Sequence, residues 1–440
     1  MSKIYCAAAK RNITPPAELI PDLYGLMMKR FAGVIDELHV RVMILSDEKE
    51  KVLFVGWELD KAPIPEIIVP KLAEKTGIPE DHILFFGTHT HTAPLHSARP
   101  GDGPNAKAKQ PENIQEGTNR YEKLLEEAVL DAAGEALGSM QPVKIGWGFG
   151  KSCIGVNRLQ YYNVEHEDGT VERITALGTD PEKDIDRTLF VMRVETQDGK
   201  PVCFFVNHAV HNCIMIGNNY DGNGKVGISA DLAGQVSGLL EQRYPGSVAL
   251  WSSGAAGDIN PVMMNQYNFP DPKDGKPMEY RDFKTTEPAQ LMLLQLSRRQ
   301  FADVVDTNRG ITCEKEEAAI TAGNVIVSTP AYKDGDEPYR VRLQAAAVGD
   351  LIFCGASGEL FESLGKAIKD VSKDRKVIII NHESTHLVDA GYIIDDEAMA
   401  RCTRADGSRD GLPGIRQTRL KAGYIKDALA AGARELFAWI

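Results

Sequence analysis

The sequence lacks the features of a membrane-spanning, disulfide-stabilised or nucleic-acid-binding protein. No run of about eighteen apolar residues occurs, so we expect no transmembrane helix. The seven cysteines are scattered and form no CxxC pair, which argues against a disulfide framework and favours reduced, buried thiols. Lysine and arginine (50) are fewer than aspartate and glutamate (62), and the net charge is −12. This balance argues against a nucleic-acid partner and against stable association with an anionic membrane.

The N-terminal residues contain no apolar segment of signal-peptide length, so we expect a cytoplasmic protein. The composition, 43% hydrophobic and 25% charged, is typical of a globular enzyme with a sizeable core. No Pro/Gly/Ser-rich linker divides the chain. We therefore expect a single domain over residues 1–440, which two merged α/β subdomains could also form. The sequence leaves a homo-oligomer open.

Short β-rich runs alternate with helical patterns, and this alternation predicts an α/β protein. Apolar residues recur at three- and four-residue intervals in the expected helices, which are 63–75, 119–138, 230–243, 286–308, 359–370 and 418–438. The expected strands are 39–45, 52–58, 83–89, 143–149, 188–194, 202–208, 247–253, 340–348, 351–357 and 376–380. Long loops are expected at 97–118, 216–227 and 265–286, which are rich in Gly, Pro, Asn and Asp.

Two histidine pairs could hold a metal. His89 and His91 follow the apolar run ILFFG, and residues at i and i+2 of an extended strand point to the same face. Such a pair at the end of a strand suits a metal site, although two polar residues capping the strand are the alternative. His208 and His211 are three residues apart, so at most one of them is a natural partner for the first pair. A hydrogen-bonded core histidine is the alternative for either.

The remaining candidates are weaker as single residues. Ser229 or Asp231 could cap the helix that begins near residue 230. Asp258 lies in a turn rich in small residues, which let a ligand approach the backbone. Glu359 is expected at a helix start, where the macrodipole favours a carboxylate, and Tyr392 resembles any half-buried strand tyrosine.

Taken together and in order, seven short motifs resemble those of the neutral ceramidases. They are THTHTAP (88–94), VNR (156–158), HAVHNCIM (208–215), ISADLAG (228–234), GAAGDINP (254–261), GELF (358–361) and AGY (390–392). The resemblance is closest to shorter bacterial relatives of the family's N-terminal catalytic domain, and it runs from about residue 7 to the last expected strand. It implies mixed β-sheets covered by helices, without the family's C-terminal immunoglobulin-like domain.

The resemblance also implies a site with one zinc ion per chain. Its ligands carry over to His89, His211, Glu359 and Tyr392. His91 corresponds to a histidine that contacts the substrate or the metal's surroundings, and Arg158 to an arginine near the scissile carbonyl. Zinc lowers the pKa of bound water towards roughly 7, which makes it a nucleophile. On this reading Arg158 and Tyr392 stabilise the oxyanion, and His91 transfers a proton to the leaving amine.

The chain departs from the family pattern at two places. Asn260 stands where neutral ceramidases carry a serine, so a nucleophilic role at that position is excluded and metal-activated water is favoured. The segment 381–392 carries the additional polar residues His382, Glu383, His386 and Asp389. We predict that Asp258 and His386 contact the substrate, and that Asn260 hydrogen-bonds to it or to the metal-bound water.

These observations predict a zinc-dependent hydrolase that acts on an amide bond of a small soluble molecule rather than on ceramide. An esterase, lactonase or lyase on the same scaffold is the first alternative, because fold and ligands do not determine the bond. A non-catalytic, zinc-containing binding protein is the second. The sequence leaves a second metal open, with His39, Asp60 and Asp231 as its candidates.

Overall fold

The computed structural model describes most of the chain. The described residues are 2–96, 111–265, 267–270, 277–280, 285–385, 391–404, 407–409, 415 and 418–440.

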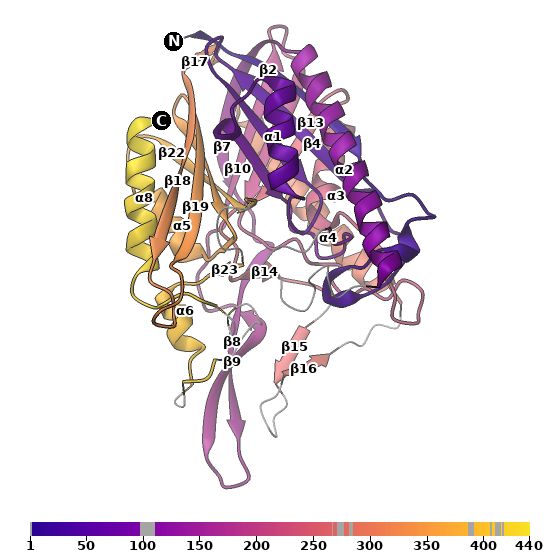
Figure 1. Cartoon of the computed structure of the whole chain (residues 1–440), viewed down its shortest axis with the longest axis vertical. Helices are drawn as coiled ribbons and strands as arrows, with labels where there is room; N and C mark the ends of the chain where they lie inside the picture. Colours follow the sequence, from indigo (N-terminus) through magenta and orange to yellow (C-terminus); the bar gives the residue numbers. More distant parts are fainter. Residues whose placement is uncertain are drawn as a thin grey trace.

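A large mixed β-sheet forms the centre of the described part of the molecule (Figure 1). Its strands are β2 (Tyr5–Asn12), β4 (His39–Ser46), β5 (Lys51–Trp57), β6 (Ile83–Gly87), β7 (Gln141–Lys151), β10 (Thr188–Thr196), β11 (Pro201–His208), β13 (Val248–Ser253), β18 (Ile320–Thr329), β19 (Tyr339–Val348), β20 (Leu351–Ser357) and β22 (Lys376–Glu383). Their order is β13-β11-β10-β7-β2-β4-β5-β6-β22-β20-β19-β18. The pairs β5–β6, β11–β13 and β20–β22 are parallel, and the other neighbours are antiparallel.

The sheet curls over itself, so that strands far apart in its order face each other across an apolar interior. The ring of Phe54 in β5 lies 5.6 Å from that of Phe205 in β11 and 5.1 Å from that of Phe353 in β20, measured between centroids. All three pairs among these rings meet edge-on, an arrangement that aromatic rings favour. Strands with apolar residues on both faces are needed here, because one face lines this interior and the other packs against helices.

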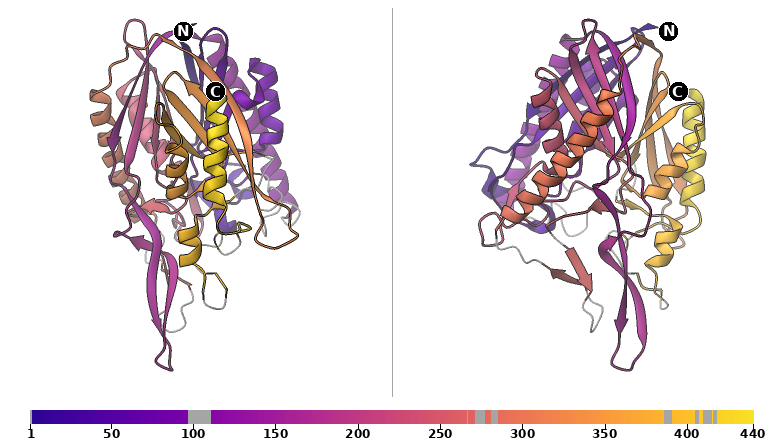
Figure 2. Two further views of the ribbon diagram at one scale, coloured as in Figure 1. Left: turned by 90° about the vertical axis from the view of Figure 1, so that its left-hand side faces the viewer. Right: turned by 180° about the vertical axis from the view of Figure 1, so that it is seen from behind.

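Three groups of helices cover the outer faces of the sheet. Figures 1 and 2 show α1 (Pro65–Thr76) and α2 (Glu112–Gly138) on one side, and α5 (Glu362–Lys369) and α8 (Ile425–Trp439) on another. The third group, α3 (Asp231–Arg243) and α4 (Glu287–Arg309), packs on β13, β10 and β7. Helix α2 shows why these segments are amphipathic: Tyr121, Leu125 and Val129 are four residues apart and all buried. The short helix α6 (Asp396–Arg401) precedes α8.

Five small sheets accompany the large one in the described part of the chain. The hairpin of β8 (Gly155–Glu165) and β9 (Val171–Asp180) pairs with β14 (Ile259–Pro261) and projects from the body in Figure 1. The other two-stranded pairings are β1 (Ser2–Lys3) with β17 (Glu317–Ala318), β3 (Phe31–Val34) with β12 (Val226–Ile228), β15 (Tyr267–Pro270) with β16 (Pro277–Tyr280), and β21 (Glu359–Leu360) with β23 (Tyr392–Ile393). The 3₁₀ turns are η1 (Ile20–Asp22), η2 (Leu26–Met28) and η3 (Glu80–His82).

The predicted α/β class is confirmed, and each expected helix and strand has a counterpart. Several boundaries differ from the expected ones. Helix α2 begins at Glu112, inside the expected loop 97–118, and the last helix begins at Ile425 rather than at residue 418. The strands β2, β8, β9 and β18 were not expected. Polar residues interrupt the apolar pattern in β8 and β9, since this hairpin projects from the body and has little core to pack against.

The cysteines fit the prediction of reduced thiols. None of the seven forms a disulfide among the described residues, and all but Cys153 are buried. None of the described helices is both long and apolar enough to cross a membrane.

Candidate metal centre

Four polar side chains meet where the chain leaves four strands of the large sheet. His89 follows β6, His211 follows β11, Glu359 follows β20, and His382 lies at the end of β22. The carboxyl ends of strands are the usual location of ligand sites in α/β folds. The site therefore collects residues from distant parts of the sequence at one end of the sheet.

His89 is held in an unusual backbone conformation. Strand β6 ends at Gly87, and His89 has a φ of 66°, so the prediction that His89 and His91 share an extended strand is wrong. The His89 backbone N–H donates to the Leu59 carbonyl at 2.9 Å, which fixes the turn. The ring Nδ1 lies 2.8 Å from the Asp60 carbonyl oxygen and 3.1 Å from Asp60 Oδ1. Because both neighbours are acceptors, Nδ1 carries a proton, and Nε2 is the nitrogen that a metal would take. Although burial lowers the pKa of His89, the charges of Glu359 and Asp60 raise it above its ordinary value.

His211 is oriented in the same way. Its side chain is fully buried, and its Nδ1 lies 2.6 Å from the Ala256 carbonyl oxygen and 3.1 Å from that of Ile259. Burial, followed by the Arg158 charge, lowers the pKa of His211 to about 4, so the ring is neutral. A neutral imidazole whose Nδ1–H donates to a carbonyl is the form in which histidine binds metals through Nε2.

Glu359 completes a donor set of three atoms. Its Oε2 lies 3.3 Å from His211 Nε2 and 3.4 Å from His89 Nε2. Although burial raises the pKa of Glu359, the two imidazoles lower it well below its ordinary value, so the carboxylate is ionised. Ligand bonds of roughly 2.0–2.1 Å place tetrahedral donor atoms about 3.3–3.4 Å apart. The two distances to Oε2 match that spacing, so these residues fit a zinc ion.

The location of Glu359 corrects one prediction. Helix α5 begins at Glu362, so Glu359 is not at a helix start. It belongs to β21, where it pairs with Tyr392 of β23. This parallel pairing brings Tyr392 to the site from more than thirty positions along the chain, and no local pattern could have indicated it.

His91 lies against the same donors. The ligand atoms of His89, His91 and His211 all fall within 4.8 Å of one another. Both ring nitrogens of His91 are buried and have no hydrogen-bond partner among the described residues. Burial and the neighbouring imidazoles hold the pKa of His91 well below its usual value. A neutral ring with two unused nitrogens suits contact with a ligand of the site or with the metal itself.

Arg158 and Asn260 form the next layer of the site. The Arg158 guanidinium is buried, donates to the Gly257 carbonyl through Nε at 3.1 Å and Nη2 at 2.5 Å, and reaches Asn260 Oδ1 through Nη1 at 3.2 Å. Its Cζ lies 5.1 Å from the centre of the Tyr392 ring. Burial raises the pKa of Tyr392 above its ordinary value despite this positive charge. Asn260 thus orients the arginine, a contact that the sequence did not indicate.

Asp258 and His386 were predicted to contact a substrate. The Asp258 carboxylate is buried and accepts from Asn157 Nδ2 and from the backbone N–H of Glu362, both at 2.9 Å. It therefore holds the start of α5 beside the site, and its predicted substrate contact stays a prediction. His386 lies outside the described residues.

Asp231 does not form the helix cap that the sequence suggested. The residue before α3 is Ala230, whose side chain makes no capping bond, and Ser229 Oγ accepts the first N–H of the helix, that of Asp231, at 3.0 Å. The Asp231 carboxylate accepts from the backbone N–H groups of Leu232, Ile214 and Met215, at 2.7, 3.2 and 2.8 Å. It thereby supports the loop that carries His211.

Of the other polar candidates, Asp60 contacts the donor residue His89, whereas His208, His39 and Asp231 have other partners. His208 binds the Thr188 carbonyl through Nδ1 at 3.0 Å, as expected of a core histidine. His39 lies 3.4 Å from Glu58, and Asp60 contacts His89. The three candidates for a second metal, His39, Asp60 and Asp231, therefore each have a separate set of partners.

His382 is the functional candidate that sequence reasoning did not identify. Its ring stacks on that of His89 with centroids 3.8 Å apart and an angle of 10° between the planes. The sequence showed it only as one of the additional polar residues of the segment 381–392, of which His386 and not His382 was assigned a substrate contact.

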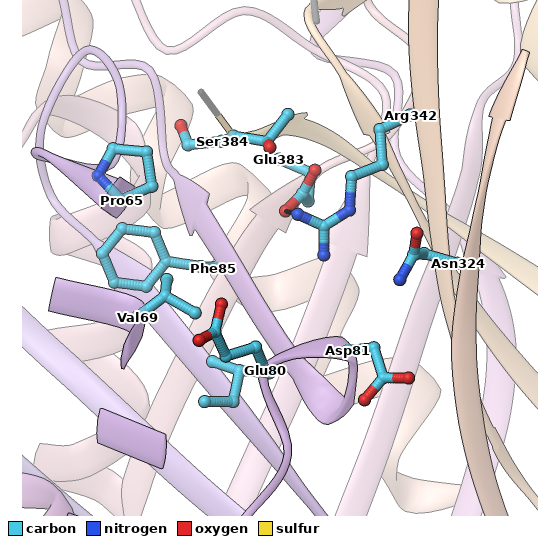
Figure 3. Close-up of a pocket in the computed structure, with 11 residues that line it drawn as sticks. Pro65, Val69, Glu80, Asp81, Phe85, Asn324, Arg342, Glu383 and Ser384 are labelled. Carbon is cyan, nitrogen blue, oxygen red and sulfur yellow. Dashed lines mark ion pairs between the residues drawn. The ribbon is translucent and has the colours of Figure 1, made fainter. Parts of the chain in front are cut away.

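A cavity of about 220 Å³ lies beside the site without including its histidines. It opens between α1, η3 and β6 on one side and β18 and β19 on the other. Figure 3 shows Arg342 and Glu383 facing each other in it, with closest charged atoms 4.0 Å apart. Because Glu383 directly follows His382, the cavity and the His382 side chain both lie at the end of β22.

Asp60 provides a first test of the site. Replacing it with alanine removes the Oδ1 contact to His89 Nδ1 but keeps the backbone acceptor. We expect zinc affinity to fall about tenfold, the lower end of the effect of losing a residue that orients a metal ligand. Competition with a chromophoric chelator measures this, with the exposed Asp131→Ala as control. Equal zinc affinities in the two variants would show that the Asp60 carboxylate does not help to orient His89.

The fold and the donors define an α/β protein with a histidine–carboxylate site at the carboxyl ends of its strands. Among solved structures, that fold is found in neutral ceramidase from Pseudomonas aeruginosa, at a TM-score of 0.64 and 14% identity, over 99% of this chain and 75% of that one. A ceramidase complexed with C2 matches at a TM-score of 0.68 and 15% identity, over 100% and 76%. No protein-family model and no curated protein matches the sequence. The predicted neutral ceramidase fold is thereby confirmed.

Proposed function

We propose that this protein is a zinc-dependent hydrolase that uses metal-activated water to cleave an amide bond. One observation carries the proposal: Nε2 of His89 and Nε2 of His211 lie 3.4 and 3.3 Å from Oε2 of Glu359, which is the spacing of tetrahedral zinc ligands. The fold shared with neutral ceramidases supports an amide as the substrate. Tyr392, opposite Glu359 in the β21–β23 pairing, is the proposed fourth ligand.

The residues around the donors would perform the remaining chemistry. When bound, zinc would polarise the carbonyl and lower the pKa of a water molecule to roughly 7. Arg158, fixed by the Gly257 carbonyl and Asn260, would stabilise negative charge on the carbonyl oxygen. His91, neutral and with both nitrogens unused among the described residues, would carry a proton towards the leaving amine.

We propose a small soluble amide rather than ceramide as the substrate. The net charge of −12 does not favour an anionic lipid surface. The polar residue His382 at the end of β22 also lies against the donor His89, where an apolar chain would gain little. We therefore propose that the protein acts in solution. Because the donors all come from one chain, the site could form in a monomer or in a homo-oligomer.

The test combines metal content with a substrate panel. Mass spectrometry should find about one zinc per chain in the wild-type protein, and none in His89→Ala. The panel contains a short N-acyl amide, its ester analogue and a long-chain ceramide, and we expect the short amide to be cleaved most efficiently. A wild-type protein that stays free of zinc after incubation with the ion would refute the proposal. Preference for the ester would contradict the proposed amide bond but would leave the proposed zinc site standing.

Arg158→Met tests the proposed oxyanion role. We expect kcat/KM to fall by about 10²–10³-fold, as after loss of one oxyanion donor, with zinc content unchanged. Circular dichroism checks that the buried substitution leaves the fold intact. Arg173→Met is the matched control, because Arg173 lies on the same hairpin with its guanidinium over the Tyr161 ring. Unchanged kcat/KM in the Arg158 variant would leave that residue with a structural role alone.

A further inference from the structure

His382 combines three features that ordinary packing does not require. Its residue is 4% exposed, and its Nε2 is buried without a hydrogen-bond partner among the described residues. Its ring lies flat on His89 at 3.8 Å and 6.1 Å from the ring of His211, between centroids. A buried nitrogen without a partner is costly, so such atoms in a site usually meet a ligand.

The backbone at His382 is strained. Its φ is 60°, in the left-handed region that a residue with a side chain seldom adopts. Hydrogen bonds fix the chain on both sides, because the His382 N–H donates to the Gly358 carbonyl at 3.0 Å and the Ser384 N–H to that of Phe85 at 2.8 Å. Strain of this kind persists where the surroundings hold it, and it concentrates at functional sites. His89 shows the same feature, with a φ of 66°.

A purely structural role fits these features poorly. A phenylalanine or leucine side chain would fill the same space without burying an unpaired nitrogen. A glycine or asparagine would relieve the backbone. His382 keeps both the unpaired nitrogen and the strained backbone. Its ring also contacts the imidazole of His89, a proposed metal ligand.

We propose that His382 is a substrate-contacting residue of this centre. The stack holds the His89 ring in its ligating orientation, and Nε2 hydrogen-bonds the polar atoms of a compound bound at the metal. This inference rests on the proposed metal-dependent function. It restricts the substrate to a polar compound that offers a hydrogen-bonding group beside its scissile carbonyl.

Two substitutions separate the two contributions. His382→Phe keeps a ring to stack on His89 but removes Nε2. His382→Asn removes the ring and tolerates the left-handed backbone, so it guards against loss of folding. Zinc affinity is measured by chelator competition. Affinity for acetohydroxamate, a small amide-like chelator, is measured on the zinc-loaded protein by calorimetry.

In His382→Phe we expect zinc affinity within about threefold of wild type and acetohydroxamate affinity about tenfold weaker, the effect of one lost hydrogen bond. In His382→Asn we expect zinc affinity itself to fall by about tenfold, because His89 loses its support. In both variants kcat for the short amide should fall more than zinc occupancy explains.

Other results would overturn the inference. Wild-type acetohydroxamate affinity in His382→Phe would show that Nε2 does not meet the bound compound, and loss of zinc from that variant would make His382 a ligand. Unchanged zinc affinity in His382→Asn would show that the stack does not hold the His89 ring in its ligating orientation. Failure of the wild-type protein to bind zinc would instead refute the proposed function, and with it the premise of the inference.

Discussion

Glu359→Gln is expected to bind zinc at least about a hundredfold more weakly and to lose about a thousandfold in kcat/KM. The carboxylate lies between two imidazole nitrogens, at 3.3 and 3.4 Å. An uncharged amide replaces the negative donor of the proposed centre, and loss of zinc removes several kcal/mol of stabilisation from the transition state. Inductively coupled plasma mass spectrometry and the short-amide assay measure the two effects.

Glu362→Gln is the matched control for this prediction. Glu362 is three residues further along the same segment, and burial, with the charge of Asp258, raises its pKa to about 7. Its backbone N–H, rather than its carboxylate, makes the contact to Asp258. We expect nearly wild-type zinc content in this variant. Equal zinc loss in both variants would indicate a general effect of charge near α5, and would contradict a ligand role for Glu359.

Arg41→Met is expected to lower the free energy of unfolding by about 3–5 kcal/mol, as when one partner of a buried ion pair is removed. Arg41 is 4% exposed and pairs with two carboxylates, Glu58 through Nη1 and Glu241 through Nε at 2.9 Å. Glu58 also accepts the backbone N–H of His39. Removing the guanidinium leaves two carboxylates with little solvation, so denaturant titration should show a lower transition midpoint.

Arg11→Met provides the comparison for that substitution. Arg11 also contacts two carboxylates, those of Asp131 and Glu135, but all three side chains are at least 30% exposed. A surface ion pair of this kind contributes about 0–1 kcal/mol. We therefore expect Arg11→Met to unfold close to the wild-type midpoint. Similar losses in both variants would show that burial does not decide the strength of these pairs.

The site shows which residues local patterns could identify. The spacing of His89 and His91 after an apolar strand correctly indicated two side chains of one cluster. The reason was different, because His89 reaches the cluster through a left-handed turn and not along an extended strand. For His208 and His211, spacing left both open. The motif resemblance chose His211, and the path of the chain after β11, with His211 bonded to the carbonyls of Ala256 and Ile259, gives the physical reason.

Glu359 and Tyr392 show the limit of that approach. Neither stands in a local pattern that marks a ligand, and both entered through the ordered resemblance of the motifs. The expectation of a helix at Glu359 was wrong, because the segment pairs with β23 before α5 begins. A two-residue strand is held by its partner and carries almost no periodicity of its own.

The sequence by itself determined the α/β class, the helices of the outer layers and the histidines worth considering, because periodicity and strand-end polar residues are local properties. The ordered motifs further indicated the neutral ceramidase fold, which the solved structures confirm. The tertiary structure alone decided the curled sheet, the distances of the two imidazole nitrogens from Glu359 Oε2 and the stack of His382 on His89. These depend on contacts between segments more than a hundred residues apart, which local chemistry permits but does not specify.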